Sequence, residues 1–248
     1  MAQTGIDVAS TGFPAGTRVY GSQGLMSIED IRVGDTVLSQ SEQGKREYKR
    51  VLNAFVYDDK TLRSITFRVI DGDRSMSICT SSDQAFLTVE QQGYVGDDGE
   101  WEDSRYPTGW IAAQRLLPDG TRLDRFADGR LAEPYQDARH HHLLQLIDGS
   151  LAEVAANAPV YRTNKRGCGW VRHRGQAPFE PDDSVDGYVV DFIDGGLVEQ
   201  RVSLDKSIYY SGNPHFKTRV YSIEVEDFGT YFVANGILVH GTNGRDFG

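Results

Sequence analysis

The sequence is poor in cysteine: Cys79 and Cys168 are the only two among 248 residues. Two cysteines do not make the disulfide framework of a small secreted domain. They also stand in none of the Cys-x-x-Cys or Cys/His spacings that bind zinc. We therefore expect two free thiols, no bound metal and no cofactor.

Long apolar runs and an excess of basic residues are also missing. No run approaches the roughly 18 residues of a membrane-spanning helix, so we expect no membrane span. Lys and Arg number 26 against 36 Asp and Glu, for a net charge of −10. This balance disfavours a nucleic-acid partner, because phosphate binding requires a basic surface. Residues 1–11 lack a basic start and an apolar stretch, so no secretory signal is expected, and the compartment stays open between cytoplasm and export within a larger protein.

Glycine and short apolar runs are abundant instead. The 27 glycines fall among turn residues that separate these runs, a pattern typical of an all-β protein. Residues 48–57 and 62–70 alternate apolar and polar side chains, as half-buried strands do. Asp-Gly between apolar runs predicts a hairpin tip, and the pair recurs at Asp128-Gly129, Asp148-Gly149 and Asp194-Gly195. One short helical segment is expected at 111–117.

Segments at the two chain ends carry a family resemblance. They are Gly12-Phe13-Pro14-Ala15-Gly16-Thr17, Ile28-Glu29-Asp30-Ile31 with Val33-Gly34-Asp35, Tyr221-Ser222-Ile223-Glu224-Val225-Glu226-Asp227, and Thr230-Tyr231-Phe232-Val233 with Val239-His240. Together they resemble the Hint domain, the self-processing module of inteins and hedgehog proteins, and most closely the pre-toxin Hint domains of bacterial polymorphic toxins. Gly109-Trp110…Leu116 is similar to a further segment of that family.

This resemblance implies an all-β, Hint-like horseshoe whose two chain ends meet at the active site. The Hint-like domain would comprise residues 12–120 and 218–241. Residues 121–217 would form a β-rich insertion, and 1–11 and 242–248 would be flanks.

The resemblance also implies a self-cleavage chemistry with four elements. A thiol or hydroxyl at the first residue attacks the preceding carbonyl and replaces the amide by a reactive ester. A Thr-x-x-His element polarises and protonates the scissile amide. A penultimate His assists at the far end, where a terminal Asn cyclises and breaks the second bond.

Two of these four elements are retained in this sequence. Thr80 matches the Thr-x-x-His element and His240 matches the penultimate His, but Asp83 stands where the histidine of the element belongs. A carboxylate is a poor general acid near neutral pH unless burial raises its pKa. Gly12 replaces the nucleophile and Gly241 replaces the cyclising Asn, so both reacting side chains are missing.

Neighbouring residues are poor substitutes for the missing groups. Ser10 and Thr11 precede Gly12, and Thr242 and Asn243 follow Gly241. A misplacement of about 1 Å can cost roughly a hundredfold in rate, which argues against rescue by a shifted residue. Cys79 precedes Thr80, but on a strand its side chain faces the other way.

Other polar clusters have simpler explanations. Arg139-His140-His141-His142 suggests a metal site, yet adjacent strand residues face opposite ways, so a polar segment is the better interpretation. Asp97-Asp98 and Asp182-Asp183 fit solvated loops, with calcium as an alternative. His173 between two arginines fits a surface strand, with an anion site as an alternative.

The sequence therefore leaves three hypotheses open. The first is a Hint-like autoprocessing module that is catalytically inactive, with the flanking segments of a larger bacterial protein as its partners. The second is an active self-cleaving protease that uses atypical residues. The third is a binding or linker module, in a secreted or toxin protein, that contacts a protein partner or a ligand through residues 121–217.

Overall fold

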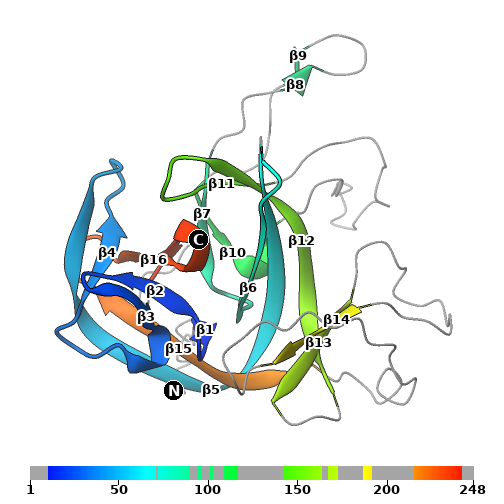
Figure 1. Ribbon diagram of the computed structural model, residues 1–248, viewed down its shortest axis with the longest axis horizontal. Coiled ribbons are helices and arrows are strands. Elements are labelled where there is room, and N and C mark those ends of the chain that lie inside the picture. The colour runs from blue at the N-terminus through cyan, green and yellow to red at the C-terminus, as the bar shows by residue number, and fades with distance from the viewer. Residues whose placement is uncertain are drawn as a thin grey trace, which may run out of the picture.

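The protein is a curled, all-β molecule in the computed structural model (Figure 1). The structure describes residues 11–70, 72–89, 94–95, 101–102, 109–116, 142–163, 167–172, 187–191 and 215–241. Within them no α-helix occurs, and the three helical turns are all of the 3-10 type. The predicted fold class is therefore borne out by the secondary structure.

The elements follow one another along the chain as short strands around one long strand. The strands are β1 (Phe13–Pro14), β2 (Arg18–Gly21), β3 (Gly24–Ser27), β4 (Thr36–Gln40), β5 (Arg46–Val69), β6 (Ser75–Ser81), β7 (Ala85–Thr88), β8 (Tyr94–Val95), β9 (Trp101–Glu102), β10 (Gly109–Ala112), β11 (Leu143–Gln145), β12 (Leu151–Arg162), β13 (Cys168–Arg172), β14 (Gly187–Asp191), β15 (Lys217–Val225), β16 (Thr230–Val233) and β17 (Ile237–His240). The 3-10 turns are η1 (Ile28–Asp30), η2 (Ala113–Arg115) and η3 (Ala234–Gly236).

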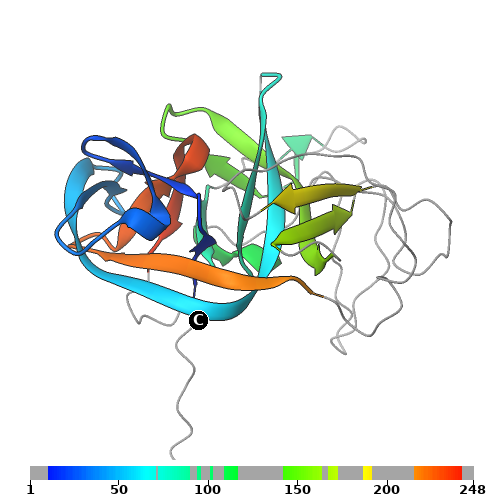
Figure 2. The same ribbon diagram turned by 60° about the horizontal axis from the view of Figure 1, so that its bottom comes forward.

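Strand β5 organises the sheet because it changes partners along its 24 residues. Its first part pairs with β4 and its middle with β15, while its last part lies between β6 and β12. Both views show β5 sweeping around the molecule beside the orange strand β15 (Figures 1 and 2). The curvature of β5 thus brings β6, from early in the chain, close to β15, from its end.

Part of the predicted insertion 121–217 is built into this same sheet. Strand β12 pairs with the last part of β5, and β11 pairs with β12 and bridges to β7 through Val89 and Leu143. The Asp148-Gly149 hairpin joins β11 to β12, with Gly149 at φ 87°. The other predicted hairpin tips, Asp128-Gly129 and Asp194-Gly195, lie outside the described residues. Residues 143–162 are therefore continuous with the Hint-like strands.

The helix expected at 111–117 is wrong. Ile111 and Ala112 belong to β10, which pairs with Phe86 and Ala85 of β7, and only the single turn η2 follows. Sheet pairing with β7 satisfies the backbone groups of 109–112, so the local helical pattern does not decide the structure.

The main hydrophobic core lies inside the curl of the sheet. It includes the buried side chains of Phe13, Val19, Val37, Ile65, Phe67, Phe86, Ile223, Tyr231, Val233 and Val239. These come from both terminal segments and from β5 and β7. Packing of the two ends against one core explains why those segments have such regular apolar spacing.

A second, smaller core covers the opposite face of β5 and β6. It contains Leu62, Cys79, Val160, Val171, Val190, Phe216 and Val220. Leu62 and Ile65 belong to different cores, as strand residues of opposite parity should. Strands β13 and β14 supply part of this layer, so apolar packing attaches them to the main sheet in addition to the pairing of β13 with β12 and of β14 with β13.

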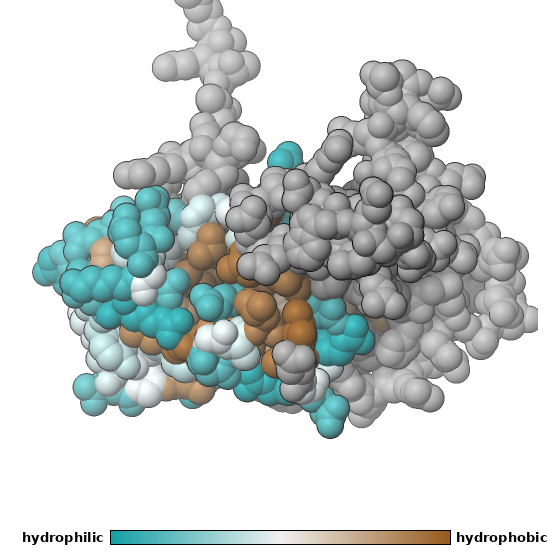
Figure 3. Space-filling view, turned by 90° about the horizontal axis from the view of Figure 1, so that it is seen from above, coloured by the Kyte–Doolittle hydropathy of each residue, from teal (hydrophilic) through white to brown (hydrophobic). Residues whose placement is uncertain are grey.

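Polar side chains dominate much of the described surface. Seen from above, the left part is largely hydrophilic and a hydrophobic area lies nearer the centre (Figure 3). Three exposed large apolar side chains of the described residues lie on β5, and the others are dispersed; the set is Leu25, Val33, Tyr48, Leu52, Val56 and Leu151. No helix in the described part of the chain is both long and apolar enough to cross a membrane.

Candidate functional site

Gly12, the predicted nucleophile position, lies buried between the end of β6 and the middle of β15. Its carbonyl oxygen accepts hydrogen bonds from the Ser81 amide at 2.9 Å and the Thr80 hydroxyl at 3.1 Å. Its amide donates to the Ser81 hydroxyl oxygen at 2.9 Å. The amide and the carbonyl of Gly12 are thus both held by β6.

Gly12 sits where a side chain does not fit. Its φ is +156°, and a Cβ would lie 2.5 Å from the Tyr221 carbonyl oxygen and 3.3 Å from Cγ2 of Val220. The first distance is far below a van der Waals contact, and the obstacle is main chain that is paired in the sheet. The position therefore lacks a reacting atom and also lacks the space for one.

His240, the predicted penultimate histidine, ends β17 and is buried. Its Nδ1 lies 2.5 Å from the Gly241 carbonyl oxygen, and the edge-on ring of Trp110 packs 5.1 Å away. A carbonyl oxygen only accepts, so this contact requires the proton on Nδ1. The His240 carbonyl oxygen in turn accepts a 2.8 Å hydrogen bond from Nε2 of Gln84.

Gly241 is packed as closely as Gly12. Its amide donates to the Gly229 carbonyl at 2.7 Å, and a Cβ would lie 2.3 Å from the Ile223 carbonyl oxygen. Tyr221 and Ile223 are two residues apart on β15, so their carbonyls point toward the same edge of that strand. The two chain ends therefore converge on the 221–223 stretch of β15.

The structure does not place Asp83 with this group. Asp83 is exposed, and its carboxylate accepts a 2.9 Å hydrogen bond from Nε2 of Gln114. Contacts to Gly12 come from Thr80 and Ser81, and the contact to His240 comes from Gln84. Of the predicted site residues, Thr80 lies with Gly12 and His240 with Gly241, while Asp83 points elsewhere.

Ser81 and Gln84 are the two residues that sequence reasoning missed. They lie on one tight turn, where the Gln84 amide donates to the Ser81 carbonyl at 3.2 Å. They also stand three positions apart, which is the spacing of a Thr-x-x-His element moved by one residue. The sequence held a signal for them, because the segment Ser81-Ser82-Asp83-Gln84 begins with a hydroxyl side chain and ends with an amide side chain.

Solved structures with a similar fold include intein and intein-like domains. The bacterial intein-like domain from Clostridium thermocellum matches with a TM-score of 0.50 and 18% sequence identity, over 94% of this chain and 99% of that chain. The chain has an intein-like fold. At this identity the match establishes the fold alone, and it confirms the predicted Hint-like architecture.

Two further inteins match at lower TM-scores. The gp41-1 intein gives 0.44 at 17% identity, and a DnaB intein from Synechocystis gives 0.46 at 12% identity, each over 94% of this chain and 99% of that chain. No protein-family model and no curated protein matches the sequence. The fold assignment accordingly rests on the Clostridium domain.

Cys79 is the one thiol near the centre of this intein-like fold, since it adjoins Thr80. Its side chain faces the second core, and burial raises the pKa of the thiol to about 12 despite a hydrogen bond with Ser64. The thiol is therefore protonated at neutral pH, and the thiolate is the reactive form. Cys168 is also buried and forms no disulfide.

A cluster of three or more His, Cys, Asp or Glu side chains that could hold a metal ion does not occur in the described part of the chain. His142 is described and buried. The other clusters considered above, at 139–141, 97–98, 173 and 182–183, lie outside the described residues.

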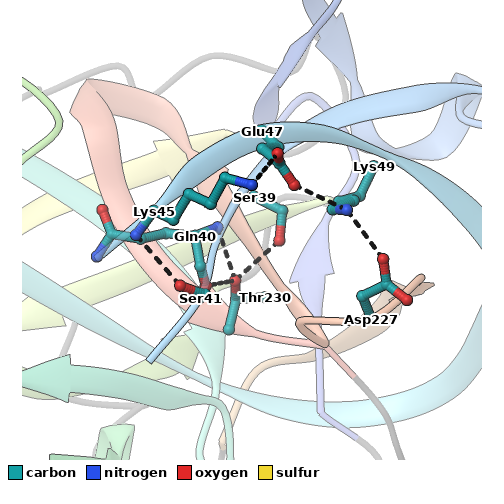
Figure 4. A network of polar contacts seen from close by, with 8 residues as sticks. All are labelled: Ser39, Gln40, Ser41, Lys45, Glu47, Lys49, Asp227 and Thr230. Carbon is teal, nitrogen blue, oxygen red and sulfur yellow. Dashed lines mark hydrogen bonds and ion pairs between the residues drawn. The ribbon is translucent and has the colours of Figure 1, made fainter. Parts of the chain in front are cut away.

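A polar network fixes the strand that pairs with His240 (Figure 4). The Thr230 hydroxyl donates to the Gln40 carbonyl at 2.7 Å, accepts from the Gln40 amide at 3.1 Å and lies 3.0 Å from the Ser39 hydroxyl. Nearby, the Lys49 ammonium bridges Glu47 and Asp227, each at 2.9 Å. The β4–β5 hairpin thereby anchors the turn that carries Gly229, the acceptor for Gly241.

Thr230→Val should destabilise the protein, because valine keeps the shape but leaves the Gln40 amide and carbonyl without this partner. We expect a loss of about 1–3 kcal/mol in the free energy of unfolding, the usual cost of stranding buried polar groups. Urea denaturation would measure it, with the half-buried Thr218→Val on β15 as the control. An equal loss in both variants would contradict a special role for the Thr230 network.

Proposed function

We propose that this chain is a Hint-like autoprocessing module that no longer cuts itself and instead holds the segments that flank it. The single observation that carries this proposal is the packing at its two ends. A Cβ at Gly12 would lie 2.5 Å from Tyr221, and one at Gly241 would lie 2.3 Å from Ile223. The reactive side chains that the family uses therefore have no place at either end.

The groups that remain around the ends support a holding role. Thr80 and Ser81 hold the amide and the carbonyl of Gly12, and Gln84 holds the carbonyl of His240. Each of these buried donors has an acceptor, and such hydrogen bonds stabilise one arrangement of the two ends. The flanks, 1–11 and 242–248, would then leave the module at a fixed place on β15.

A fusion with one reporter domain on each end tests this function. We expect a single full-length species on a denaturing gel and by intact mass after days at pH 6–9, with or without added thiol. The holding role predicts this because neither Gly12 nor Gly241 supplies a nucleophile. Fragments that end at Thr11 or His240 would contradict it.

The second candidate, an atypical self-cleaving protease, has Ser81 as its natural nucleophile. Its hydroxyl oxygen lies 2.9 Å from the Gly12 amide nitrogen. Because it accepts that N–H, the Ser81 oxygen lies near the plane of the Thr11–Gly12 peptide. Nucleophilic attack on the Thr11 carbonyl carbon would come from above or below that plane, so the hydroxyl is not aligned for attack. Cleavage in the fusion that disappears in Ser81→Ala would favour this candidate over the holding role.

The module would lie within a longer polypeptide. An intein-like fold whose ends meet suits an internal module, with polypeptide on both sides. We propose that its partners are those flanking segments, within a larger, toxin-bearing bacterial protein, as the resemblance to pre-toxin Hint domains suggests.

A further inference from the structure

A group of hydrogen-bond donors lies beside the site, where the last part of β5 meets β12 and β13, since Arg63 on β5 is also paired with Thr80 of β6. Arg63 on β5 pairs with Pro159 of β12, so Asn157 and Tyr161, two residues to either side of Pro159, share its face of the sheet. Tyr161 pairs with Trp170 of β13, and the two rings lie 5.8 Å apart. These strands run side by side at the right of Figure 1.

Arg63 is held in place by an uncharged partner. Its Nε donates to Oδ1 of Asn157 at 2.7 Å and its Nη2 donates to the Asn157 carbonyl at 3.3 Å. The Asn157 amide is itself fixed, because Nδ2 donates to the carbonyls of Ala113 and Leu116 at 2.7 and 2.8 Å. The guanidinium is thus oriented before any ligand arrives.

The charge of Arg63 has no acidic partner among the described residues. A guanidinium carries five N–H groups, and Asn157 engages one at Nε and one at Nη2. Burial lowers the pKa of Arg63, which reflects the cost of removing this cation from water. Partly buried arginines normally meet a carboxylate or phosphate that offsets that cost.

Trp170 supplies a second hydrogen-bond donor, its indole N–H. Only 1% of the residue is exposed, and its indole Nε1–H finds no acceptor among the described residues. A buried indole N–H ordinarily has a hydrogen-bond partner. Tyr161 lies between Trp170 and Arg63, and His215 packs on the Tyr161 ring at 5.6 Å.

We propose that Arg63, Tyr161 and Trp170 form a binding site for an oxyanion, the carboxylate or phosphate group of a ligand. The fork of a guanidinium matches the paired oxygens of such groups, and the indole N–H adds a directed donor. The site joins a Hint-like strand, β5, to strands of the predicted insertion. Arg63 neighbours Thr80 of the candidate site, but anion binding is measured without reference to whether the module cuts itself.

Nuclear magnetic resonance titration of the whole protein tests the site. Sodium acetate and sodium phosphate are added separately, with sodium chloride at equal ionic strength as the background. We expect saturable shifts of the Arg63 Nε–H and Trp170 indole resonances, with an affinity of roughly millimolar for such small anions. A response to acetate alone assigns a carboxylate, and a response to phosphate alone assigns a phosphate group.

Three variants assign the response to these side chains. Arg63→Met should weaken binding by at least about tenfold, since a charged hydrogen-bonding partner is lost. Trp170→Phe keeps the ring packing and removes only the N–H, and Arg63→Lys keeps the charge without the fork, so both should weaken binding in a folded protein. Arg162→Met, at an exposed position of β12 next to Tyr161, should leave binding unchanged.

Two outcomes would overturn the proposal. One is the absence of a saturable shift at Arg63 and Trp170 with either anion. The other is an unchanged affinity in both variants, followed at the Trp170 indole in Arg63→Lys and at the Arg63 Nε–H in Trp170→Phe, which would place the anion elsewhere.

Discussion

Gly12→Ala is expected to lower the free energy of unfolding by roughly 2–4 kcal/mol, a large effect for one added methyl group. Two costs combine at this position. The added Cβ would lie 2.5 Å from the Tyr221 carbonyl oxygen, and the φ of +156° is one that side chains rarely adopt. The obstacle belongs to β15, which is paired with both β1 and β5, so it cannot move alone. Chemical denaturation of both proteins would measure the difference.

Gly34→Ala is the matched control. Gly34 also has a positive φ, +96°, but nothing lies within 4 Å of the place where its Cβ would be. We expect a loss on the order of 1 kcal/mol there, from the backbone conformation alone. If Gly12→Ala lowered the free energy of unfolding no more than Gly34→Ala, β15 would be moving aside to admit the side chain. The conclusion that position 12 has no space for a side chain would then be wrong.

The same packing bears on attempts to restore self-cleavage. Gly12→Cys with Asp83→His and Gly241→Asn follows from the sequence, but Asp83 is exposed and bonded to Gln114. Gln84 is the residue that contacts His240. A reactivated design would need compensating changes near both Tyr221 and Ile223, because the added side chains at positions 12 and 241 would meet their carbonyls.

Phe13→Ala should be as damaging, with a loss of roughly 3–5 kcal/mol in the free energy of unfolding. Phe13 is completely buried and meets the rings of Phe86 and Tyr231 edge-on, at 6.5 and 6.4 Å. It follows Gly12 directly, so its ring fixes the N-terminal end against strands from the middle and the end of the chain. Thermal and chemical denaturation would report the loss.

Two companion variants separate packing from general effects. Phe13→Leu keeps most of the apolar volume and should cost less than half as much. Phe55→Ala removes a half-buried ring that stacks on Tyr57 and should also cost less. Equal losses in the free energy of unfolding at positions 13 and 55 would contradict the claim that the Phe13 ring fixes the N-terminal end.

The terminal segments were predictable because their pattern is local. Alternating apolar residues at 221, 223 and 225 and at 231 and 233 must face one core, and Asn235-Gly236 must turn, so these segments could be placed from sequence alone. The region at 111–117 was not, because its helical spacing competes with pairing to β7, a partner more than twenty residues away. Joining of 143–162 to β5 is likewise a long-range pairing that composition does not encode.

Part of the site could be predicted and part could not, for a related reason. Gly12, Thr80, His240 and Gly241 follow from aligned motifs, and the structure brings each to one of the two chain ends. The tight turn at 81–84 decides which side chains face inward, and it turns Ser81 and Gln84 in and Asp83 out. Crowding by Tyr221 and Ile223 depends on strand packing that no motif reveals.

The central claim is that the module holds its ends without cutting them, and the intact mass of the purified 248-residue chain tests it most directly. After prolonged incubation near neutral pH, with and without added thiol, we predict one species of 27.6 kDa. A species that begins at Gly12 or ends at His240 would show that a bond at one of the two glycines is broken, and would contradict the account.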